Sequence, residues 1–133
     1  MLVGVFYRRP GSDPTDFNNT LTEILTIVNA ENKPSYYLGN FNLDLLKSSN
    51  HPPTNHFIAT NFAHSFFPLI AKPTRITSST ATLIDNIFTN VLDQPSSVHG
   101  IILTDISDHL PIFHVTYRKL KAKLASTTPK RSN

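Results

Sequence analysis

The first residues of the chain form an apolar stretch that constrains the fold more than any other part of the sequence. In residues 2–8 (LVGVFYR), apolar side chains occupy both odd and even positions, interrupted only by Gly4. This pattern predicts a β-strand that is apolar on both faces, and such strands are normally buried between two layers. Because only Met1 precedes the strand, we expect a chain that begins inside a domain, with one strand face left without its cover.

A helix and a second strand are predicted directly after this first strand. Pro10-Gly11 breaks the strand, and Asp13-Pro14 has the pattern of an N-cap followed by proline at the first helical position. Residues 36–41 (YYLGNF) are predicted to form a second buried strand, and strand, helix and strand with short links imply neighbouring parallel strands or a layered α/β domain. The helix is predicted over residues 14–30 from apolar residues at helical spacing, namely Phe17, Leu21, Ile24, Leu25 and Val28.

The remaining sequence alternates helix and strand signals with irregular segments. A second helix is predicted over residues 54–66, whereas residues 67–82, with two prolines and a Thr/Ser-rich run, are expected to be irregular. The length of 133 residues allows one domain, which we place at residues 1–117. Three further strands are predicted over residues 83–88, 98–103 and 111–117.

Residues 118–133 differ from the rest of the chain in charge, and we expect them to form a basic, poorly ordered tail. Two interpretations stay open: a solvated tail, or an arm that contacts phosphates or links to a further domain. The segment holds half of the twelve Lys and Arg residues, namely Arg118, Lys119, Lys121, Lys123, Lys130 and Arg131.

Composition excludes several kinds of site. The chain has no cysteine, which excludes disulfides, thiolate nucleophiles and cysteine-based zinc sites, so any metal must be held by oxygen or by histidine. No apolar run approaches the roughly 18 residues needed to cross a bilayer, and we therefore expect no membrane partner. The net charge of +3 suits a polyanionic partner without identifying one.

Three short polar clusters lie at the ends of predicted strands, where ligands of α/β sheets usually bind. They are residues 39–42 (GNFN), 84–87 (IDNI) and 107–109 (SDH). Each cluster alone has an ordinary explanation: asparagines favour turns, an aspartate at a strand end is often a cap, and an Asp-His pair is frequent by chance. Only their order along the chain makes them informative.

In that order, the clusters resemble the endonuclease/exonuclease/phosphatase superfamily, whose motifs are G-D-x-N, a hydrophobic-Asp-hydrophobic strand and S-D-H-x-P. More narrowly, the chain resembles the endonuclease domain of LINE-type non-LTR retrotransposons in VGVFYRRP, YYLGNFNLDLLKS, KPTRITSSTATLIDNIFTN and TDISDHLPIF. The resemblance covers nearly all of residues 2–117. It implies the superfamily's four-layered α/β sandwich with a mixed sheet, of which this chain would be the C-terminal half.

The resemblance also implies a role for each matching residue in the hydrolysis of a DNA phosphodiester. Asp108 would help to bind Mg²⁺ or Mn²⁺, a hard cation that stabilises charge on the phosphoryl oxygens. His109 would contact the scissile phosphate, with Asp85 orienting its ring. Tyr7 matches an active-site tyrosine near the phosphate, and Asn42 matches an asparagine that orients the attacking water or a phosphate oxygen.

Two departures from the family pattern predict that the chain cannot cleave DNA by itself. Asn40 stands where the family has an aspartate that accepts a proton from the attacking water or orients it. An amide has no useful basicity, and losing a general base costs about 10²–10⁴ in rate. The family's metal-binding glutamate and a further asparagine lie upstream of the motif with which this chain begins.

Three hypotheses remain open at this point: an endonuclease fragment that needs its missing half, a non-catalytic nucleic-acid-binding remnant, and a decayed copy without function. Nuclear action is expected of the parent element, but no clear signal encodes it. We predict that the matching side chains converge on one concavity. We also predict that strands 2–8, 36–41 and 83–88 leave a broad apolar face open, which favours self-association.

Overall fold

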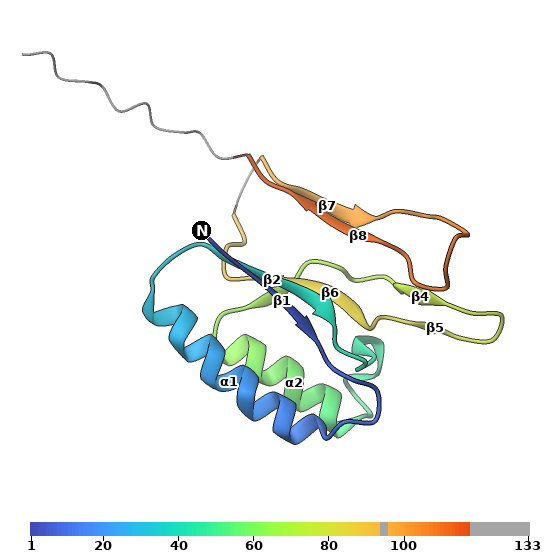
Figure 1. The fold of residues 1–133 in the computed structure, drawn as a ribbon, viewed down its shortest axis with the longest axis horizontal. Coiled ribbons are helices and arrows are strands. Elements are labelled where there is room, and N and C mark those ends of the chain that lie inside the picture. Colours follow the sequence, from blue (N-terminus) through green and yellow to red (C-terminus); the bar gives the residue numbers. More distant parts are fainter. Residues whose placement is uncertain (94–95, 118–133) are drawn as a thin grey trace, which may run out of the picture.

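The computed structural model describes residues 1–93 and 96–117. The predicted basic tail, residues 118–133, lies outside the described residues. Within them the chain is a mixed α/β structure, as the sequence predicted (Figure 1). In chain order the elements are β1 (Leu2–Tyr7), α1 (Pro14–Ala30), β2 (Ser35–Asn40), the 3-10 turn η1 (Leu45–Lys47), α2 (Pro52–Ala63), β3 (Phe67–Pro68), β4 (Arg75–Ile76), β5 (Ala81–Thr82), β6 (Asp85–Thr89), β7 (Val98–Ile101) and β8 (Ile112–Val115).

Helix α1 begins and ends where local chemistry requires it. The Asp13 carboxylate accepts a hydrogen bond from the Thr15 N–H at 2.8 Å, and Pro14 occupies the first turn, where its missing N–H has no partner to lose. Leu21 and Leu25, one turn apart, are fully buried beneath the helix. Asn32, with a φ of 54°, turns the chain out of the helix toward β2.

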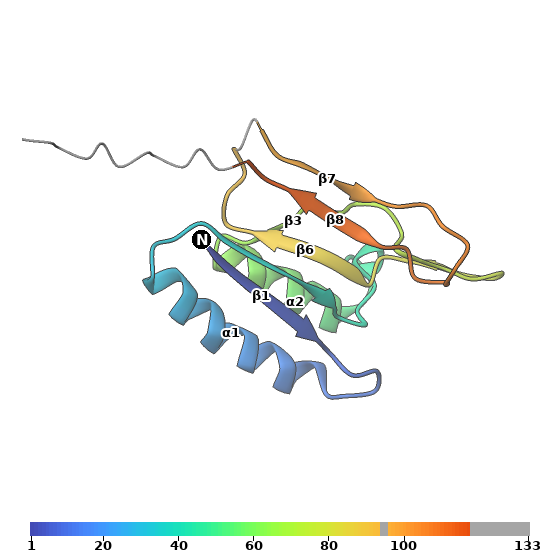
Figure 2. The ribbon, with the colours of Figure 1, turned by 45° about the horizontal axis from the view of Figure 1, so that its top comes forward.

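The main sheet has the strand order β1-β2-β6-β3 and is mixed. β1 and β2 run parallel, as the strand–helix–strand pattern predicted, whereas β6 is antiparallel to both of its neighbours. Figure 2 shows β6 running against β1 and β2. Gly39 is needed for the close approach of β2 to β1, because a Cβ at this position would lie 1.8 Å from the Phe6 carbonyl oxygen.

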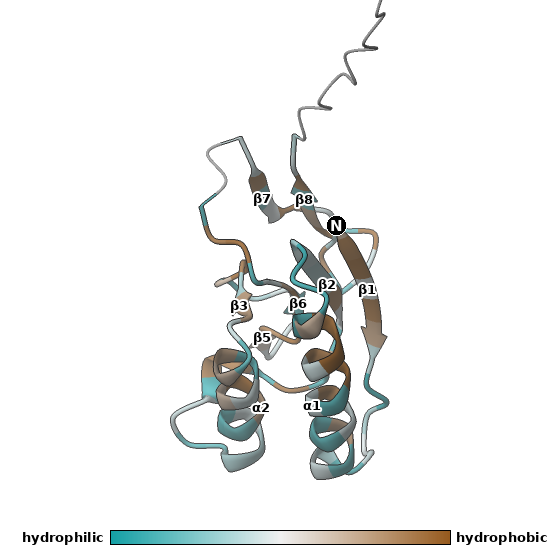
Figure 3. Cartoon of the chain, turned by 90° about the vertical axis from the view of Figure 1, so that its left-hand side faces the viewer, coloured by the Kyte–Doolittle hydropathy of each residue, from teal (hydrophilic) through white to brown (hydrophobic). Residues whose placement is uncertain are grey.

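Both helices cover one face of this sheet and enclose the hydrophobic core. Figure 3 shows α1 and α2 on one side of the sheet and the β7–β8 hairpin on the other. Aromatic rings dominate the core, where Tyr37 and Phe88 stack at 5.1 Å between centroids. Burial of these large side chains is the main stabilising contribution of the helix layer. The core consists of Leu21, Leu25, Tyr37, Phe41, Leu43, Phe57, Phe66 and Phe88.

The other sheet face is only partly open, which corrects the prediction of a broad apolar face over three strands. The β7–β8 hairpin packs above β2 and β6, with the rings of His114 and Tyr36 4.9 Å apart. That prediction is therefore wrong for β2 and β6, because the sequence did not show that the last two strands form a second layer. It holds for β1, where Val3, Val5 and Tyr7 are 60%, 77% and 67% exposed.

The segment between α2 and β6 also differs from its prediction. Helix α2 ends at Ala63 instead of residue 66, because Ser65 takes a φ of 61° and the Phe66 N–H bonds back to the Asn61 carbonyl. Residues 67–82 are not irregular throughout, since they contain the two-residue strands β3, β4 and β5. None of the described helices is long and apolar enough to cross a membrane.

Candidate functional site

Three strands bring one predicted side chain each to a single row across the sheet. In the strand register Tyr7 is opposite Asn40, and Asn40 is opposite Asp85. Residues directly opposite each other on neighbouring strands project from the same face, so these three positions share the face on which the β7–β8 hairpin packs. The row lies where β1 and β2 end and β6 begins.

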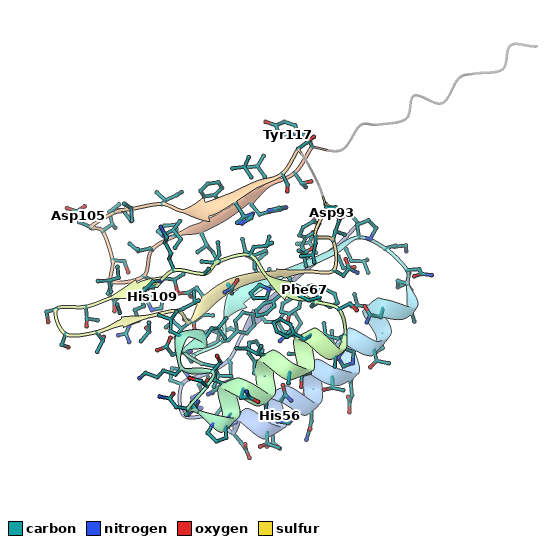
Figure 4. All side chains as sticks on the ribbon, turned by 180° about the vertical axis from the view of Figure 1, so that it is seen from behind. His56, Phe67, Asp93, Asp105, His109 and Tyr117 are labelled. Carbon is teal, nitrogen blue, oxygen red and sulfur yellow. The ribbon has the colours of Figure 1, made fainter. Side chains whose placement is uncertain are left out.

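Asp85 and His109, 24 residues apart in sequence, form a hydrogen-bonded pair. The His109 Nδ1 lies 3.0 Å from Asp85 Oδ2, and the His109 and Asp85 side chains are 39% and 16% exposed. Figure 4 shows His109 at the end of the sheet from which the β4–β5 hairpin projects. With Nδ1 directed at the carboxylate, the ring presents Nε2 on its other side.

A residue that the sequence analysis did not single out, Thr74, fixes this aspartate. The Thr74 hydroxyl donates to Asp85 Oδ2 at 2.9 Å and accepts from the N–H groups of Asp85 and Ile84 at 3.0 and 3.3 Å. Its carbonyl accepts from Leu110 N–H at 2.7 Å, next to His109. The fully buried Thr74 therefore positions Asp85 directly and His109 through the backbone of the next residue, Leu110. Thr74 lies in PTRIT (residues 73–77), part of a stretch that resembles the retrotransposon endonucleases, and this position was the sequence signal that could have identified it.

Asp108, the predicted metal ligand, is paired with an arginine. Arg75 Nε donates to Asp108 Oδ2 at 2.8 Å, and both side chains are 42% exposed. This hydrogen bond, with the positive charge of Arg75, holds the pKa of Asp108 below its usual range. The Asp108 carbonyl also accepts from Ile76 N–H at 2.8 Å, so β4 anchors the residue twice. The sequence analysis gave Arg75 no role.

The two asparagines of the G-N-F-N motif shape the turn that follows β2. Asn40 Oδ1 accepts from the Asn42 backbone N–H at 3.0 Å, and Asn42, with a φ of 49°, donates its own Nδ2 to the Arg8 carbonyl at 2.6 Å. Because a backbone N–H only donates, the Asn40 atom that faces it must be the amide oxygen. The other end of this amide, Nδ2, has no hydrogen-bond partner among the described residues.

Arg8, which follows Tyr7 in the YRRP stretch, points into its own loop. Its Nη1 donates to the Arg9 carbonyl, the Ser12 carbonyl and the Ser12 hydroxyl, each at 3.2 Å. The residue is only 7% exposed, and burial lowers the pKa of its guanidinium, against the opposing attraction of Asp13. Arg8 therefore fastens the β1–α1 loop to the sheet edge.

The predicted residues converge only in part. Asn40, Asp85 and His109 line one open hollow of about 340 Å³. Tyr7 belongs to the same row but lines a different hollow beside α1, Asn42 is held in the turn, and Asp108 is paired with Arg75. The hollow is lined by Leu38, Gly39, Asn40, Asp85, His109, Leu110, Pro111 and Ile112.

The donor set of this edge fits Mg²⁺ poorly. Mg²⁺ prefers free carboxylates and water, but Asp108 is occupied by Arg75 and Asp85 by Thr74 and His109. Within residues 1–93 and 96–117, no three His, Asp or Glu residues are grouped so that they could hold a metal ion. A larger hollow of about 550 Å³ lies elsewhere, between β7 and residues 69–76, and contains none of the predicted site residues.

Comparison with known proteins supports the fold without identifying a family. No protein-family model matches the chain, and no curated protein matches it in sequence. Among solved structures, the endonuclease domain of TRAS1, a telomere-specific non-LTR retrotransposon, matches over 87% of this chain with 13% identity and a TM-score of 0.66. Beta toxin 275-280 from Staphylococcus aureus matches over 87% with 16% identity and a TM-score of 0.56.

The chain spans only part of the length of both structures, 57% of the TRAS1 domain and 53% of the beta toxin. At these identities the match concerns the arrangement of the backbone and not the chemistry of the site. The described residues therefore share the backbone arrangement of part of the TRAS1 domain, a mixed sheet with two helices.

Proposed function

We propose that this chain is a piece of a DNA endonuclease of the LINE type and that it does not hydrolyse DNA by itself. The observation that carries the proposal is the Asp85–His109 hydrogen bond beside Asn40, at the end of a sheet shared with the TRAS1 endonuclease domain. A carboxylate that fixes a histidine ring, with the outer nitrogen open to a hollow, suits contact with a phosphodiester oxygen.

The same edge lacks what hydrolysis needs besides phosphate contact. Asn40 presents an amide where the family's aspartate would act on the attacking water, and an amide cannot take up its proton. A bound divalent cation would supply charge stabilisation on the phosphoryl oxygens, but the nearest carboxylates are already paired. His109 and Asp85 can therefore bind and orient a phosphodiester here without cleaving it.

A plasmid-nicking assay with Mg²⁺ tests this proposal. The unmodified chain should not nick DNA, and Asn40→Asp alone should not rescue it, because no residue of this chain matches the family's upstream glutamate. Fusing the N-terminal half of a homologous endonuclease should restore cleavage chiefly in the Asn40→Asp version, with a gap of about 10²–10⁴ between the two fusions. Asn19→Asp, which adds the same charge on the exposed face of α1, is the matched control.

Two outcomes would count against the proposal. Robust Mg²⁺-dependent nicking by the unmodified chain, lost on His109→Ala, would show that the described residues build a working site. A fusion that cleaves equally well with the native Asn40 and with Asn40→Asp would remove the role given to this position.

A further inference from the structure

Both ring nitrogens of His114 are buried where the β7–β8 hairpin packs on the main sheet. The centroid of this ring lies 4.9 Å from that of Tyr36, which belongs to β2. Neither Nδ1 nor Nε2 of His114 has a hydrogen-bond partner among the described residues. A buried imidazole without such partners contributes to packing only through its ring surface, and its polar atoms already oppose the burial.

A second histidine, His99, faces His114 within the hairpin. The two residues are opposite each other in the β7–β8 register, and their ring centroids lie 6.2 Å apart. Opposite positions of an antiparallel pair project from the same face. His99 is exposed, whereas the ring nitrogens of His114 are almost inaccessible to water. A charge on both rings would therefore place two like charges side by side, one of them without solvent.

The elements packed around the hairpin offer His114 no negative charge. His114 lines a hollow of about 250 Å³ whose other titratable groups are the Tyr36 phenol and the amino group of Met1. The larger hollow on the β7 side adds Lys72. None of the described residues that line either hollow carries a carboxylate, and Asp85, on β6, already has its own histidine partner. A protonated His114 would have no counter-ion here.

Protonation therefore opposes the packing of the hairpin. Burial, and after it the charge of His99, lowers the pKa of His114 below its usual range. An imidazolium has two N–H donors, and in this position both would be buried without an acceptor. Solvating these donors requires the ring to leave its place between the hairpin and the sheet.

We propose that the β7–β8 hairpin is a pH-sensitive flap, which packs on the main sheet while His114 is neutral and separates from it when His114 is protonated. The hairpin is a two-stranded sheet of its own, so its separation breaks no strand pairing of the main sheet. Pro111 and Ile112 line the hollow of about 340 Å³ at the sheet edge. Movement of the hairpin would consequently open one wall of that hollow.

Amide hydrogen exchange of the full chain at pH 7.5 and pH 5.5, corrected for the intrinsic exchange rates, tests the flap. The open hairpin binds the proton more tightly than the closed one, so the closed form is favoured above the usual histidine range and disfavoured below it. Protection of residues 98–101 and 112–115 should fall severalfold, and at most about tenfold, the limit for one proton taken up near a pKa of about 6.5. Protection in α1 and β2 should stay constant.

Three variants make the experiment specific. His114→Phe keeps an aromatic ring against Tyr36 and cannot be protonated, so the hairpin should be equally protected at both pH values. His114→Gln, which is also neutral throughout, should behave in the same way and replaces the phenylalanine variant if that chain does not fold. His56→Phe removes an exposed histidine of α2, far from the hairpin in sequence, and should lose protection as the unmodified chain does.

The results that would overturn the proposal are equally specific. Hairpin protection that is the same at both pH values in the unmodified chain, or that falls as much in the two His114 variants, excludes the flap. A parallel loss of protection in α1 and β2 would show general unfolding instead. A ring titration of His114 by NMR in the unmodified chain should lie below the ordinary value of about 6.5, and a higher value would also refute the proposal.

Discussion

Replacing Thr74 by valine should destabilise the whole site, because one hydroxyl makes three of its hydrogen bonds. The Thr74 Oγ1 donates to Asp85 Oδ2 at 2.9 Å and accepts from the N–H groups of Asp85 and Ile84. Valine has nearly the same shape but leaves two N–H groups and a carboxylate oxygen without this partner. Thr74 is 0% exposed, so water cannot substitute for the lost hydroxyl.

The expected cost of Thr74→Val is about 2–4 kcal/mol of unfolding free energy, since one buried polar group left unpaired costs about 1–3 kcal/mol. His109 keeps its bond to Asp85, which limits the total. For a domain of this size the change corresponds to a fall in Tm of roughly 7–15 °C. Urea unfolding followed by circular dichroism gives the free energy directly.

Two further variants make the measurement specific. Thr74→Ser retains the hydroxyl and loses a methyl group, so it should cost only about 1 kcal/mol. Thr20→Val removes an exposed hydroxyl that bonds to its own helix carbonyl, and it should change stability by less than about 0.5 kcal/mol. If Thr74→Val unfolds at the same urea concentration as Thr74→Ser, the hydroxyl does not hold Asp85 and the account of the site is wrong.

Two other predictions concern the open face and the Arg75–Asp108 pair. Sedimentation of the chain should depend on concentration, and Val5→Lys on the open face of β1 should abolish the association; a monomer at all concentrations would contradict this. Because the folded pKa of Asp108 is depressed, its contribution to stability is present above the usual aspartate range and is lost as pH falls through the folded value. Acid unfolding of Asp108→Asn should therefore be less steep than that of the unmodified chain, and equal slopes would exclude the pair.

Elements with a long periodic pattern could be predicted from the sequence, and short ones could not. The first strand, α1 and the parallel pairing of β1 with β2 follow from apolar spacing and from the Asp13-Pro14 cap. The two-residue strands β3, β4 and β5 are too short to show alternation. Pro68 argued against a strand at β3, because proline has no N–H to donate to a neighbouring strand. The structure tolerates it because β3 lies at the edge of the sheet.

At the candidate site, the sequence predicted which residues lie together but not the hydrogen-bond partners of their side chains. The order of motifs led to the expectation that Asp85 and His109 lie together, and their atoms are 3.0 Å apart. The orientation of the Asn40 amide and the pairing of Asp108 with Arg75 depend on partners that no motif spacing reveals. These contacts, and not the motif matches, determine whether the edge can hold a cation.

The strand register links the open face of β1 to the candidate site. Val3, Val5 and Tyr7 alternate along β1 and project from one face, and Tyr7 is also the first member of the row that continues through Asn40 to Asp85. A segment that covers Val3 and Val5 and continues along β1 reaches the Tyr7 ring, which is 67% exposed. Covering this face would restrict the rotamers of Tyr7, which lines the hollow beside α1. Covering the open face of β1 and restricting the Tyr7 side chain are consequently one structural event, because the same strand carries Val3, Val5 and Tyr7.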